Sequence, residues 1–425
     1  MRFGHASLSP WALLVVGLVA CSSSGRPVAH ARASPPSPAD FGFSSIEAEG
    51  MDPLPFLDLA TWVRDHPVPI FSFLVSRNGH VVFELYTSSL DRDAAHYMMS
   101  VTKSVVSTLV GIAIDRRLLP SPDAPIVDTL PADLFGSETD RDRFRAVTIK
   151  DLLAMSALDA PDPPRSRTPE ALARHRAFLA SDNRVRFALT QVLVTAPGQT
   201  FLYNDIGPSL ATGMITYAAH ESALRFAEEN LFGPMEFQHY EWMHEDPSGI
   251  DNGGYGLRLR PVDMQKLGVL YLHRGSWHGR QLVPAAWVDA SFTPWMRSNP
   301  DRRDPDYGWY WWSSSFGPHW MAHAAKGWKG QRIVVVPEQG IVVTMTAYVN
   351  SGDEDALATR LIEDYIVPSV EHGKNRSLGP NAQATASLSS VLEEVRRGPS
   401  RAGPDAEPRM IPSVSQKEEH HEPAR

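Results

Sequence analysis

The sequence predicts an α/β protein of the α+β type, in which both ends of the chain build one antiparallel sheet flanked by helices. β-rich runs occur near the N-terminus, at 70–86, and return in the C-terminal third, at 307–349. The region between them, about 120–300, holds helical segments mixed with many loops. One sheet with a mostly helical inserted domain is the simplest arrangement of these segments.

The first two strands are predicted to form a hairpin. The stretch "IFSFLVSRNGHVVFELY" consists of two β-rich runs that meet at Asn78-Gly79, and Asn-Gly is a strong signal for a two-residue hairpin turn. A closing helix is predicted at 353–367. The later strands are predicted at 307–314, 319–325, 331–337 and 341–349.

Four consecutive aromatic residues stand in the first of these late runs: Trp309, Tyr310, Trp311 and Trp312. Successive side chains of a strand point to opposite faces. Half of these rings are therefore expected to pack into the core. The alternative is that some of them form the rim of an apolar acyl-binding pocket.

The N-terminus has the features of a secretory signal. Arg2 precedes an apolar run from Trp11 to Ala20, which is too short to span a bilayer comfortably and fits a signal-peptide core. The sequence "LVAC", ending at Cys21, resembles a bacterial lipobox, whose cysteine is lipidated and becomes the first mature residue. The alternative is a plain secretory signal that contains the only cysteine of the chain.

Composition divides the chain after this signal, which occupies residues 1–21. Residues 22–48 are rich in Ser, Pro and Ala and are predicted to be a flexible linker. Residues 49–370 are predicted to form the folded domain. Residues 371–425 are polar and rich in Pro, Gly and Ser, and are predicted to be a disordered tail in which 389–397 is compatible with a short helix.

Cysteine usage and charge exclude several functions. With Cys21 lipidated, no cysteine remains for a disulfide or a cysteine-ligated zinc site. The lipid would anchor the chain to the membrane of the bacterial cell envelope, on the periplasmic or cell-surface side. The formal net charge is −9, and no basic patch with interleaved aromatic residues is found, so nucleic acid is not an expected partner.

Ser100 and Lys103 stand at the start of an apolar helical segment, "SVTKSVVSTLVGIAID". A buried ammonium is costly unless it is partnered, and residues three apart share a helix face, so Lys103 can reach the Ser100 hydroxyl. At a helix N-terminus, free N–H groups would favour an anion developing at Ser100. A desolvated lysine has a lowered pKa and can accept a serine proton. The pair therefore predicts an acyl-enzyme hydrolase that works without histidine.

The same two residues also fit an N-cap serine followed by a lysine that reaches solvent. Ser-x-x-Lys is common by chance, although it occurs once in this chain. We find no Gly-x-Ser-x-Gly elbow, no His-Glu-x-x-His and no phosphate-binding glycine loop. A histidine-dependent triad and a metal mechanism are therefore poorly supported.

Further stretches, in order, make the sequence similar to the serine β-lactamase and penicillin-binding-protein-like superfamily. "VTIKDLLAMSALD" (147–159) resembles the segment after the nucleophile helix, and "PGQTFLYND" (197–205) resembles the Tyr-x-Asn motif. "AKGWKGQRIVVVPE" (325–338) stands where Lys-Thr-Gly or a variant is found. The sequence looks most like class C β-lactamases, related esterases and especially 6-aminohexanoate-dimer hydrolases. The resemblance spans about 50–366 and implies a β-lactamase/transpeptidase-like fold.

The resemblance also implies roles for individual residues. Ser100 is the nucleophile, and Lys103 is its general base or proton relay. Tyr203 is the second-motif tyrosine, whose phenol could shuttle a proton between Ser100, Lys103 and the leaving group. The oxyanion hole would use the backbone N–H groups of Ser100 and of Trp328, which follows the motif glycine, Gly327.

Three positions depart from the family pattern. Asp205 stands where asparagine is usual, and Ala157 replaces the glycine of Ser-Gly-Leu. Ala325-Lys326-Gly327 occupies the place of Lys-Thr-Gly. Asp205, Lys326 and Gly327 are candidate substrate-binding residues, and Lys326 or Lys329 could replace the lysine that binds a substrate carboxylate in lactamases. These changes argue against an efficient β-lactamase.

The sequence therefore predicts a serine hydrolase that forms an acyl-enzyme at Ser100 and cleaves a small ester or amide, without a metal or an organic cofactor. A DD-carboxypeptidase or β-lactamase-like enzyme acting on cell-wall peptides or β-lactams is the nearest alternative. An alternative of another class is a non-catalytic lipoprotein that binds peptidoglycan fragments. The presence of Ser100, Lys103 and Tyr203 argues against it, because a binding protein is free to lose them.

Overall fold

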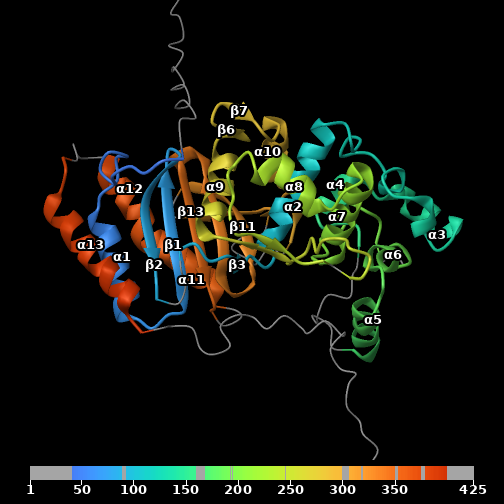
Figure 1. Ribbon diagram of the computed structural model, residues 1–425, viewed down its shortest axis with the longest axis horizontal. Coiled ribbons are helices and arrows are strands. Elements are labelled where there is room, and N and C mark those ends of the chain that lie inside the picture. The colour runs from blue at the N-terminus through green and yellow to red at the C-terminus, as the bar shows by residue number, and fades with distance from the viewer. Residues whose placement is uncertain are drawn as a thin grey trace, which may run out of the picture. The chain divides into compact units, whose positions relative to one another are not determined.

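One antiparallel sheet built from both ends of the chain organises the fold, as the sequence predicts (Figure 1). In this computed structural model the strands lie in the order β2-β1-β13-β12-β11-β10-β9-β8. The N-terminal strand β1 pairs along its length with β13, the last strand of the sheet in the sequence. Their bounds are β1 Ile70–Arg77, β2 His80–Tyr86, β8 Met296–Arg297, β9 Asp306–Tyr307, β10 Trp312–Phe316, β11 Trp320–Gly327, β12 Gln331–Val336 and β13 Ile341–Ala347.

The structure describes one unit of the chain within residues 37–425. The predicted lipidation site Cys21, the first part of the predicted linker and the end of the predicted tail lie outside the described residues. The described residues are 41–88, 92–158, 168–191, 193, 195–244, 246–298, 306–316, 319–349, 353–374 and 379–399.

The turn between β1 and β2 has the backbone that the Asn-Gly signal predicts. Asn78 and Gly79 both have positive φ, 54° and 92°. These are the conformations of a type I′ turn, which asparagine and glycine tolerate at low cost. The predicted hairpin is confirmed.

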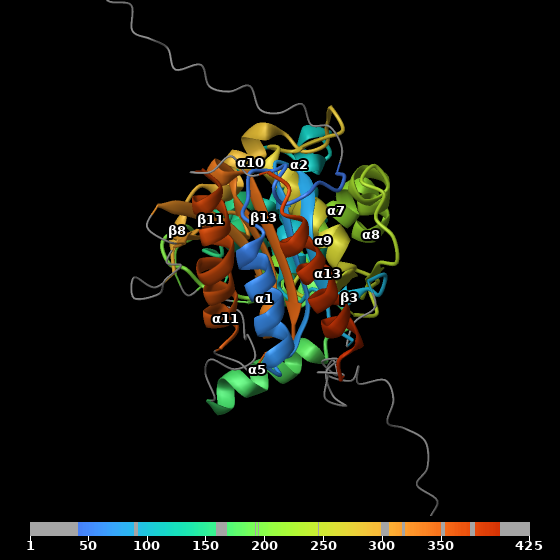
Figure 2. The same ribbon diagram turned by 90° about the vertical axis from the view of Figure 1, so that its left-hand side faces the viewer.

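Helices cover both faces of the sheet. On one face lie α1 (Leu54–Asp65), α11 (Glu354–Leu361), α12 (Val367–Lys374) and α13 (Ala382–Arg397), which come from the two ends of the described chain (Figure 2). On the other face, α9 (Pro261–Leu272) packs on β1, β12 and β13, and α2 (Val101–Asp115) packs on β11 and β12. Side chains of β12 therefore alternate between two cores, with Ile333 in one and Val334 in the other.

The helical region that the sequence places between the strands lies beyond α2 and α9 (Figure 1). Two small sheets accompany it, with β3 (His96–Tyr97), β5 (Leu257–Leu259) and β4 (Glu241–Trp242) in one, and β6 (Ser276–Trp277) and β7 (Arg280–Gln281) in the other. Its helices are α3 Glu138–Arg143, α4 Ile149–Leu153, α5 Pro169–Leu179, α6 Arg184–Leu189, α7 Ile206–Ala219 and α8 Ala223–Ala227, followed by α10 Ala285–Phe292.

The prediction of a disordered tail from residue 371 is wrong for 371–374, which close α12, and for the segment that forms α13. Leu388, Val391 and Val395 of α13 recur at helical spacing and are buried. They belong to the core that α1 also faces, and Arg64 of α1 donates a hydrogen bond to Glu394 at 3.0 Å. The sequence suggested a short helix only for 389–397, and the polar composition concealed that it begins at Ala382 and docks on the core, because only one narrow stripe of it is apolar.

The end of the predicted linker is also ordered. Ser44 N–H donates to the Val81 carbonyl at 3.0 Å, and Val81 N–H donates to the Gly42 carbonyl at 2.8 Å. Ile46 is buried in the core between the sheet and helices α1 and α13. The prediction of a flexible linker is therefore wrong for 41–48, where backbone pairing with β2 and one apolar side chain fix the chain.

The four aromatic residues do not alternate across a strand. Residues 308–311 form the turn between β9 and β10, and Tyr310 has a positive φ of 62°. All four rings are buried, because the turn inserts between two helices. Tyr310 N–H donates to the Leu153 carbonyl at 3.0 Å, and Ser104 Oγ donates to the Tyr310 carbonyl at 2.7 Å.

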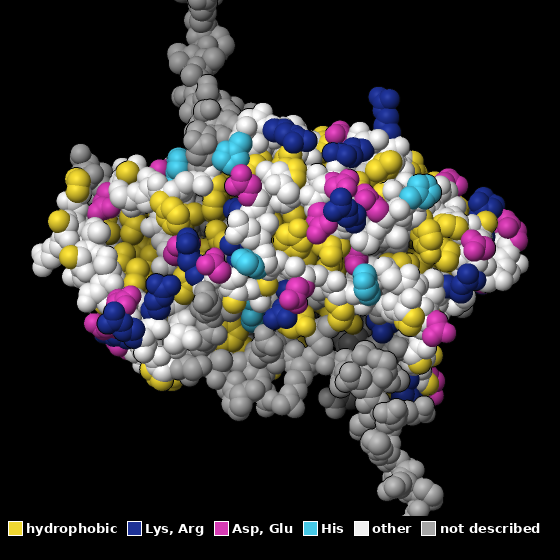
Figure 3. All heavy atoms as spheres, in the orientation of Figure 1, with side chains coloured by type: hydrophobic (Ala, Val, Ile, Leu, Met, Phe, Trp, Pro, Cys, Tyr) yellow, Lys and Arg dark blue, Asp and Glu magenta, His cyan; other side chains and the backbone are white. Residues whose placement is uncertain are grey.

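Within the described ranges, no helix has both the length and the apolar character needed to cross a membrane. Basic and acidic side chains are intermixed on the face shown in Figure 3. Many of them form exposed ion pairs, such as Arg225 with Glu228 at 3.2 Å. Such pairs contribute little to stability, so the buried cores account for most of it.

Replacing Leu388 by alanine is expected to lower the free energy of unfolding by about 2–3 kcal/mol, the lower part of the range for buried leucine because α13 lies at the surface. Denaturant unfolding of Leu388→Ala measures the effect. Ser390→Ala, at an exposed position of the same helix, is the control and should leave the midpoint unchanged. Equal stability of both variants would contradict the docking of α13.

Candidate active site

Ser100 is the N-cap residue of α2, the helix predicted to carry the nucleophile. Met98 N–H donates to the Leu257 carbonyl at 3.0 Å, which ties the chain before Ser100 to β5. Met99 has a positive φ of 49°, a conformation that is strained for a non-glycine residue and often occurs at functional sites. Nearly the whole of α2 is buried, so the position of Ser100 is held by packing on all sides.

The Lys103 ammonium lies at the centre of the site. Lys103 Nζ donates to three oxygens: Ser100 Oγ at 3.0 Å, Asp205 Oδ1 at 2.5 Å and the Gly254 carbonyl at 2.7 Å. The Lys103 side chain is only 1% exposed. The alternative of a lysine that reaches solvent is therefore wrong: the side chain turns back to the nucleophile, and it is paired as a buried charge must be.

The segment before α7 (Ile206–Ala219) supplies Tyr203 and Asp205. Between them, Asn204 is buried and donates from Nδ2 to the Leu158 carbonyl at 3.1 Å, while its Oδ1 accepts from Gly207 N–H at 2.7 Å. These bonds fix the backbone on either side. Asp205 can therefore meet Lys103 from the segment that the Tyr-x-Asn resemblance identified.

A loop near β5 delivers the third acceptor. Asn252 is buried, and its Oδ1 accepts from Gly254 N–H at 3.1 Å and from Tyr255 N–H at 2.8 Å. Gly253 packs so closely that a Cβ atom there would lie 2.2 Å from the Pro208 carbonyl oxygen. The Gly254 carbonyl is thus held toward Lys103 by a folded loop rather than by a side chain.

Tyr203 stands between the ammonium and an aromatic wall. Lys103 Nζ is 5.0 Å from the centre of the Tyr203 ring. The ring contacts Phe201, Tyr307 and Trp312 at centroid distances of 6.4, 6.3 and 5.9 Å. The aromatic wall, defined by these three residues, fixes the ring of Tyr203 beside Lys103.

Two buried phenols near Tyr203, Tyr307 of the aromatic wall and Tyr310, stay neutral near neutral pH. Burial raises the pKa of Tyr307 well above its usual value, and the neighbouring Tyr203, Tyr310 and Asp205 add to the shift. Burial likewise raises the pKa of Tyr310, with Tyr203 as the second cause. Neither group is able to supply a negative charge to the site near neutral pH.

The third motif lies beside the nucleophile. Gly327 ends β11, and a Cβ atom there would lie 2.3 Å from the Met98 carbonyl oxygen and 3.2 Å from the Met99 Cβ. Trp328 follows in a short turn, with its side chain half exposed. Only glycine allows the end of β11 to approach the residues before Ser100 this closely. The backbone of Trp328 follows directly after this point of close approach.

Lys326 forms an ion pair with Asp355, a residue of α11. Lys326 Nζ lies 3.3 Å from Asp355, which also binds Arg332 at 2.6 Å. Burial alone would raise the pKa of Asp355, but the two cations hold that pKa below its usual value. Lys326 Nζ also lies over the ring of Trp312, at 5.7 Å.

The structure therefore brings Ser100 and Asp205 into contact with Lys103 and places the Tyr203 ring beside that lysine. Asp205 was predicted to bind substrate, and in the structure its carboxylate accepts a hydrogen bond from Lys103. The Gly254 carbonyl was not predictable from the sequence, because a backbone acceptor leaves no signal in the residue types. Asp355 was not predicted either, because it stands in a helix with ordinary surface charges.

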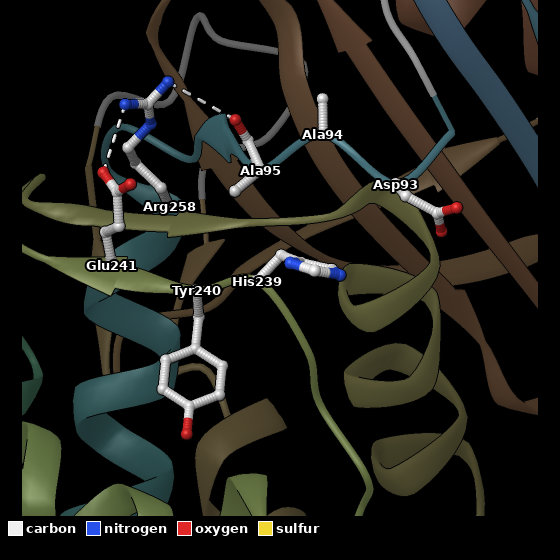
Figure 4. Close-up of a pocket in the computed structure, with 7 residues that line it drawn as sticks. All are labelled: Asp93, Ala94, Ala95, His239, Tyr240, Glu241 and Arg258. Atoms are coloured by element: carbon white, nitrogen blue, oxygen red, sulfur yellow. Dashed lines mark hydrogen bonds and ion pairs between the residues drawn. The ribbon is translucent and has the colours of Figure 1, made fainter.

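A separate surface hollow of about 380 Å³ lies on the three-stranded sheet (Figure 4). Its charged groups partner one another: Arg258 donates to Glu241 at 3.2 Å and to the Ala95 carbonyl at 3.4 Å. Its lining is Asp93, Ala94, Ala95, His239, Tyr240, Glu241 and Arg258, and includes neither the predicted nucleophile nor its lysine.

A family model described as Beta-lactamase matches residues 43–365. This chain belongs to the Beta-lactamase family. The matched range covers the sheet, α2 and every contact of the candidate site.

Individual Beta-lactamase relatives agree with this assignment. The 6-aminohexanoate-dimer hydrolase of Paenarthrobacter ureafaciens is 24% identical over 224 residues, which cover 52% of this chain and 56% of that enzyme. The match thus spans little more than half of the length of that curated relative.

Solved structures show the same fold. A putative 6-aminohexanoate-dimer hydrolase from Bacillus anthracis has a TM-score of 0.59 at 18% identity, covering 72% of this chain and 80% of that chain. A class C β-lactamase mutant has a TM-score of 0.53 at 15% identity, covering 72% and 96%. The predicted β-lactamase/transpeptidase-like fold is confirmed.

Replacing Gly327 by alanine is expected to slow phosphonylation of Ser100 by a fluorophosphonate about 10²-fold, because β11 must move away from Met98 and a misplacement of about 1 Å at a reacting centre costs that much. The rate of covalent labelling measures the effect. Gly379→Ala is the control, since no atom lies within 4 Å of its added Cβ. Unchanged labelling of Gly327→Ala would contradict the close approach of β11 to the nucleophile.

Proposed function

We propose that this Beta-lactamase family hydrolase forms an acyl-enzyme at Ser100 and cleaves small esters or amides. The observation that carries the proposal is the contact between Ser100 Oγ and the buried Lys103 ammonium, with Tyr203 beside it. A serine hydroxyl is a weak nucleophile until a neighbouring group takes its proton. The site supplies two candidates, Lys103 in its neutral form and the Tyr203 phenol, ionised.

The reaction proceeds in two halves. Ser100 Oγ attacks the acyl carbon as its proton passes to the base, and the carbonyl oxygen becomes an oxyanion. Backbone N–H groups of Ser100 and Trp328 are the proposed donors to that oxyanion. The intermediate collapses, the leaving alcohol or amine takes the proton, and the acyl group stays on Ser100. Water repeats the sequence and releases a carboxylic acid.

The charges of the site favour acyl donors without a carboxylate. Lys103 is paired with Asp205, and Lys326 is paired with Asp355. Lys326, one of the two lysines expected to replace the carboxylate-binding lysine of lactamases, therefore already has an anionic partner. This supports an esterase or amidase, and it disfavours the alternative of a DD-carboxypeptidase or β-lactamase-like enzyme.

The place of action remains a proposal from the sequence. Lipidation of Cys21 would hold the enzyme at the bacterial cell envelope by its N-terminus, with a small ester or amide as its substrate. Membrane fractionation of the full chain and of Cys21→Ser tests it. The lipoprotein proposal requires that the variant leave the membrane fraction.

Replacing Ser100 by alanine is expected to abolish hydrolysis of a short-chain p-nitrophenyl ester, because the acyl acceptor is lost. Lys103→Ala should slow it by about 10²-fold or more. Ser107→Ala, about two turns further along the same helix, is the control and should keep the rate. Full activity of Ser100→Ala would contradict the proposal, and a folded wild-type chain inert toward esters, amides and fluorophosphonates would favour the binding lipoprotein.

Replacing Tyr203 by phenylalanine keeps the ring against the aromatic wall and removes only the hydroxyl. We expect kcat to fall by about 10²–10⁴-fold, the usual contribution of a proton-transfer group, with little change in KM. Steady-state kinetics with the same ester measures both. A wild-type kcat would assign Tyr203 a packing role and leave proton transfer to Lys103 alone.

A further inference from the structure

Lys103 uses every donor that an ammonium group has. A protonated lysine carries three N–H groups and no acceptor, and Lys103 Nζ has three oxygens within 3.0 Å. A neutral amine has only two N–H groups and would keep all three contacts only if the Ser100 hydroxyl donated its proton to the amine lone pair. The direct contact with the Asp205 carboxylate favours the ammonium form, which makes an ion pair there.

We propose that Asp205 is a positioning residue that fixes Lys103 as an ammonium ion and thereby confines efficient acylation of Ser100 to higher pH. The inference rests on the proposed function and deepens it. Asp205 stands where the family usually has asparagine, which has nearly the same shape but no charge. The departure therefore adds one negative charge beside the catalytic lysine without changing the size of the side chain.

The sign of the effect follows from the charge of Asp205. When neutral Lys103 takes the proton of Ser100, the carboxylate of Asp205 opposes formation of the neutral amine by stabilising the ammonium. Asp205 thus holds Lys103 in its protonated form, and the rate of acylation falls as the pH is lowered.

Other groups around Lys103 do not replace this charge. The Gly254 carbonyl and Ser100 Oγ are neutral acceptors. The buried phenols of Tyr307 and Tyr310 stay protonated. Beyond the aromatic wall, Lys326 is balanced by Asp355. Asp205 thus supplies a carboxylate in direct contact with the Lys103 ammonium.

The carboxylate is also close to the reacting oxygen. Because Lys103 Nζ lies 2.5 Å from Asp205 Oδ1 and 3.0 Å from Ser100 Oγ, these two oxygens cannot be further apart than the sum of the two distances. An opposite charge within about 4–6 Å shifts the pKa of an ionisable group by about 1–3 units. For Lys103, that opposite charge is the Asp205 carboxylate. Asp205 is 21% exposed, so solvent screens part of its charge and the lower part of that range is expected.

The test is the pH dependence of acylation in Asp205→Asn. The rate of fluorophosphonate labelling is measured between about pH 5 and pH 10 for wild type and variant. In the variant, the rise of the labelling rate with pH should occur about one pH unit lower than in wild type. At a pH below both rises, the variant's rate, divided by its own plateau rate, should therefore be about tenfold higher than the same ratio for wild type. Glu84→Gln is the matched control. It removes a carboxylate on β2 that is paired with Arg92, and it should leave the pH dependence of labelling unchanged. An acid limb that does not move in a folded, labelled Asp205→Asn chain would overturn the proposal.

A second measurement uses the wild-type chain, in case the variant folds poorly. Nitrogen-15 labelling of the lysines allows the Lys103 amine to be observed by NMR and assigned with Lys103→Met. The proposal requires an ammonium signal that persists at about pH 9, near the usual lysine range. A neutral amine at about pH 7 would contradict it. This readout does not need catalysis, so a chain that labels with no reagent but shows the ammonium would defeat the proposed function and leave the charge assignment intact.

Discussion

The buried ammonium of Lys103 is the constraint on which the site depends. A charge that is 99% hidden from water must be paired and fully hydrogen-bonded, or the chain loses several kcal/mol of stability. Three separate segments meet that demand: the start of α2, the segment before α7 and the loop that carries Gly254. The requirement of one cation thus fixes the relative positions of three segments that are far apart in the sequence.

The rest of the fold makes this convergence possible. The sheet joins the two chain ends, and β12 is buried on both faces, so α2 and α9 rest on a rigid surface. The end of β11 then reaches the residues before Ser100 through Gly327. The nucleophile, its lysine and the third motif therefore lie on elements supported by one sheet, which is how an active site is held precisely.

Much of this was predictable because it depends on local patterns. The Asn78-Gly79 turn, the late β runs and the pair Ser100 and Lys103 all carry their signals within a few residues. The interaction of Lys103 with Asp205 links residues 102 positions apart, and only the order of family motifs suggested that the two segments meet. The Gly254 carbonyl carried no signal at all. The first half of helix α13 and the turn at Tyr310 were missed, and only 389–397 was foreseen as a possible short helix, because tertiary packing, rather than local composition, determines these segments.

The most direct test of the account is the site of a covalent adduct. Trypsin should release residues 93–103, which contain one serine, Ser100. After exposure of the wild-type chain to a fluorophosphonate, we predict that the added mass is confined to this peptide and to Ser100 within it. An adduct on another residue, with this peptide unmodified, would contradict the assignment of Ser100 as the nucleophile.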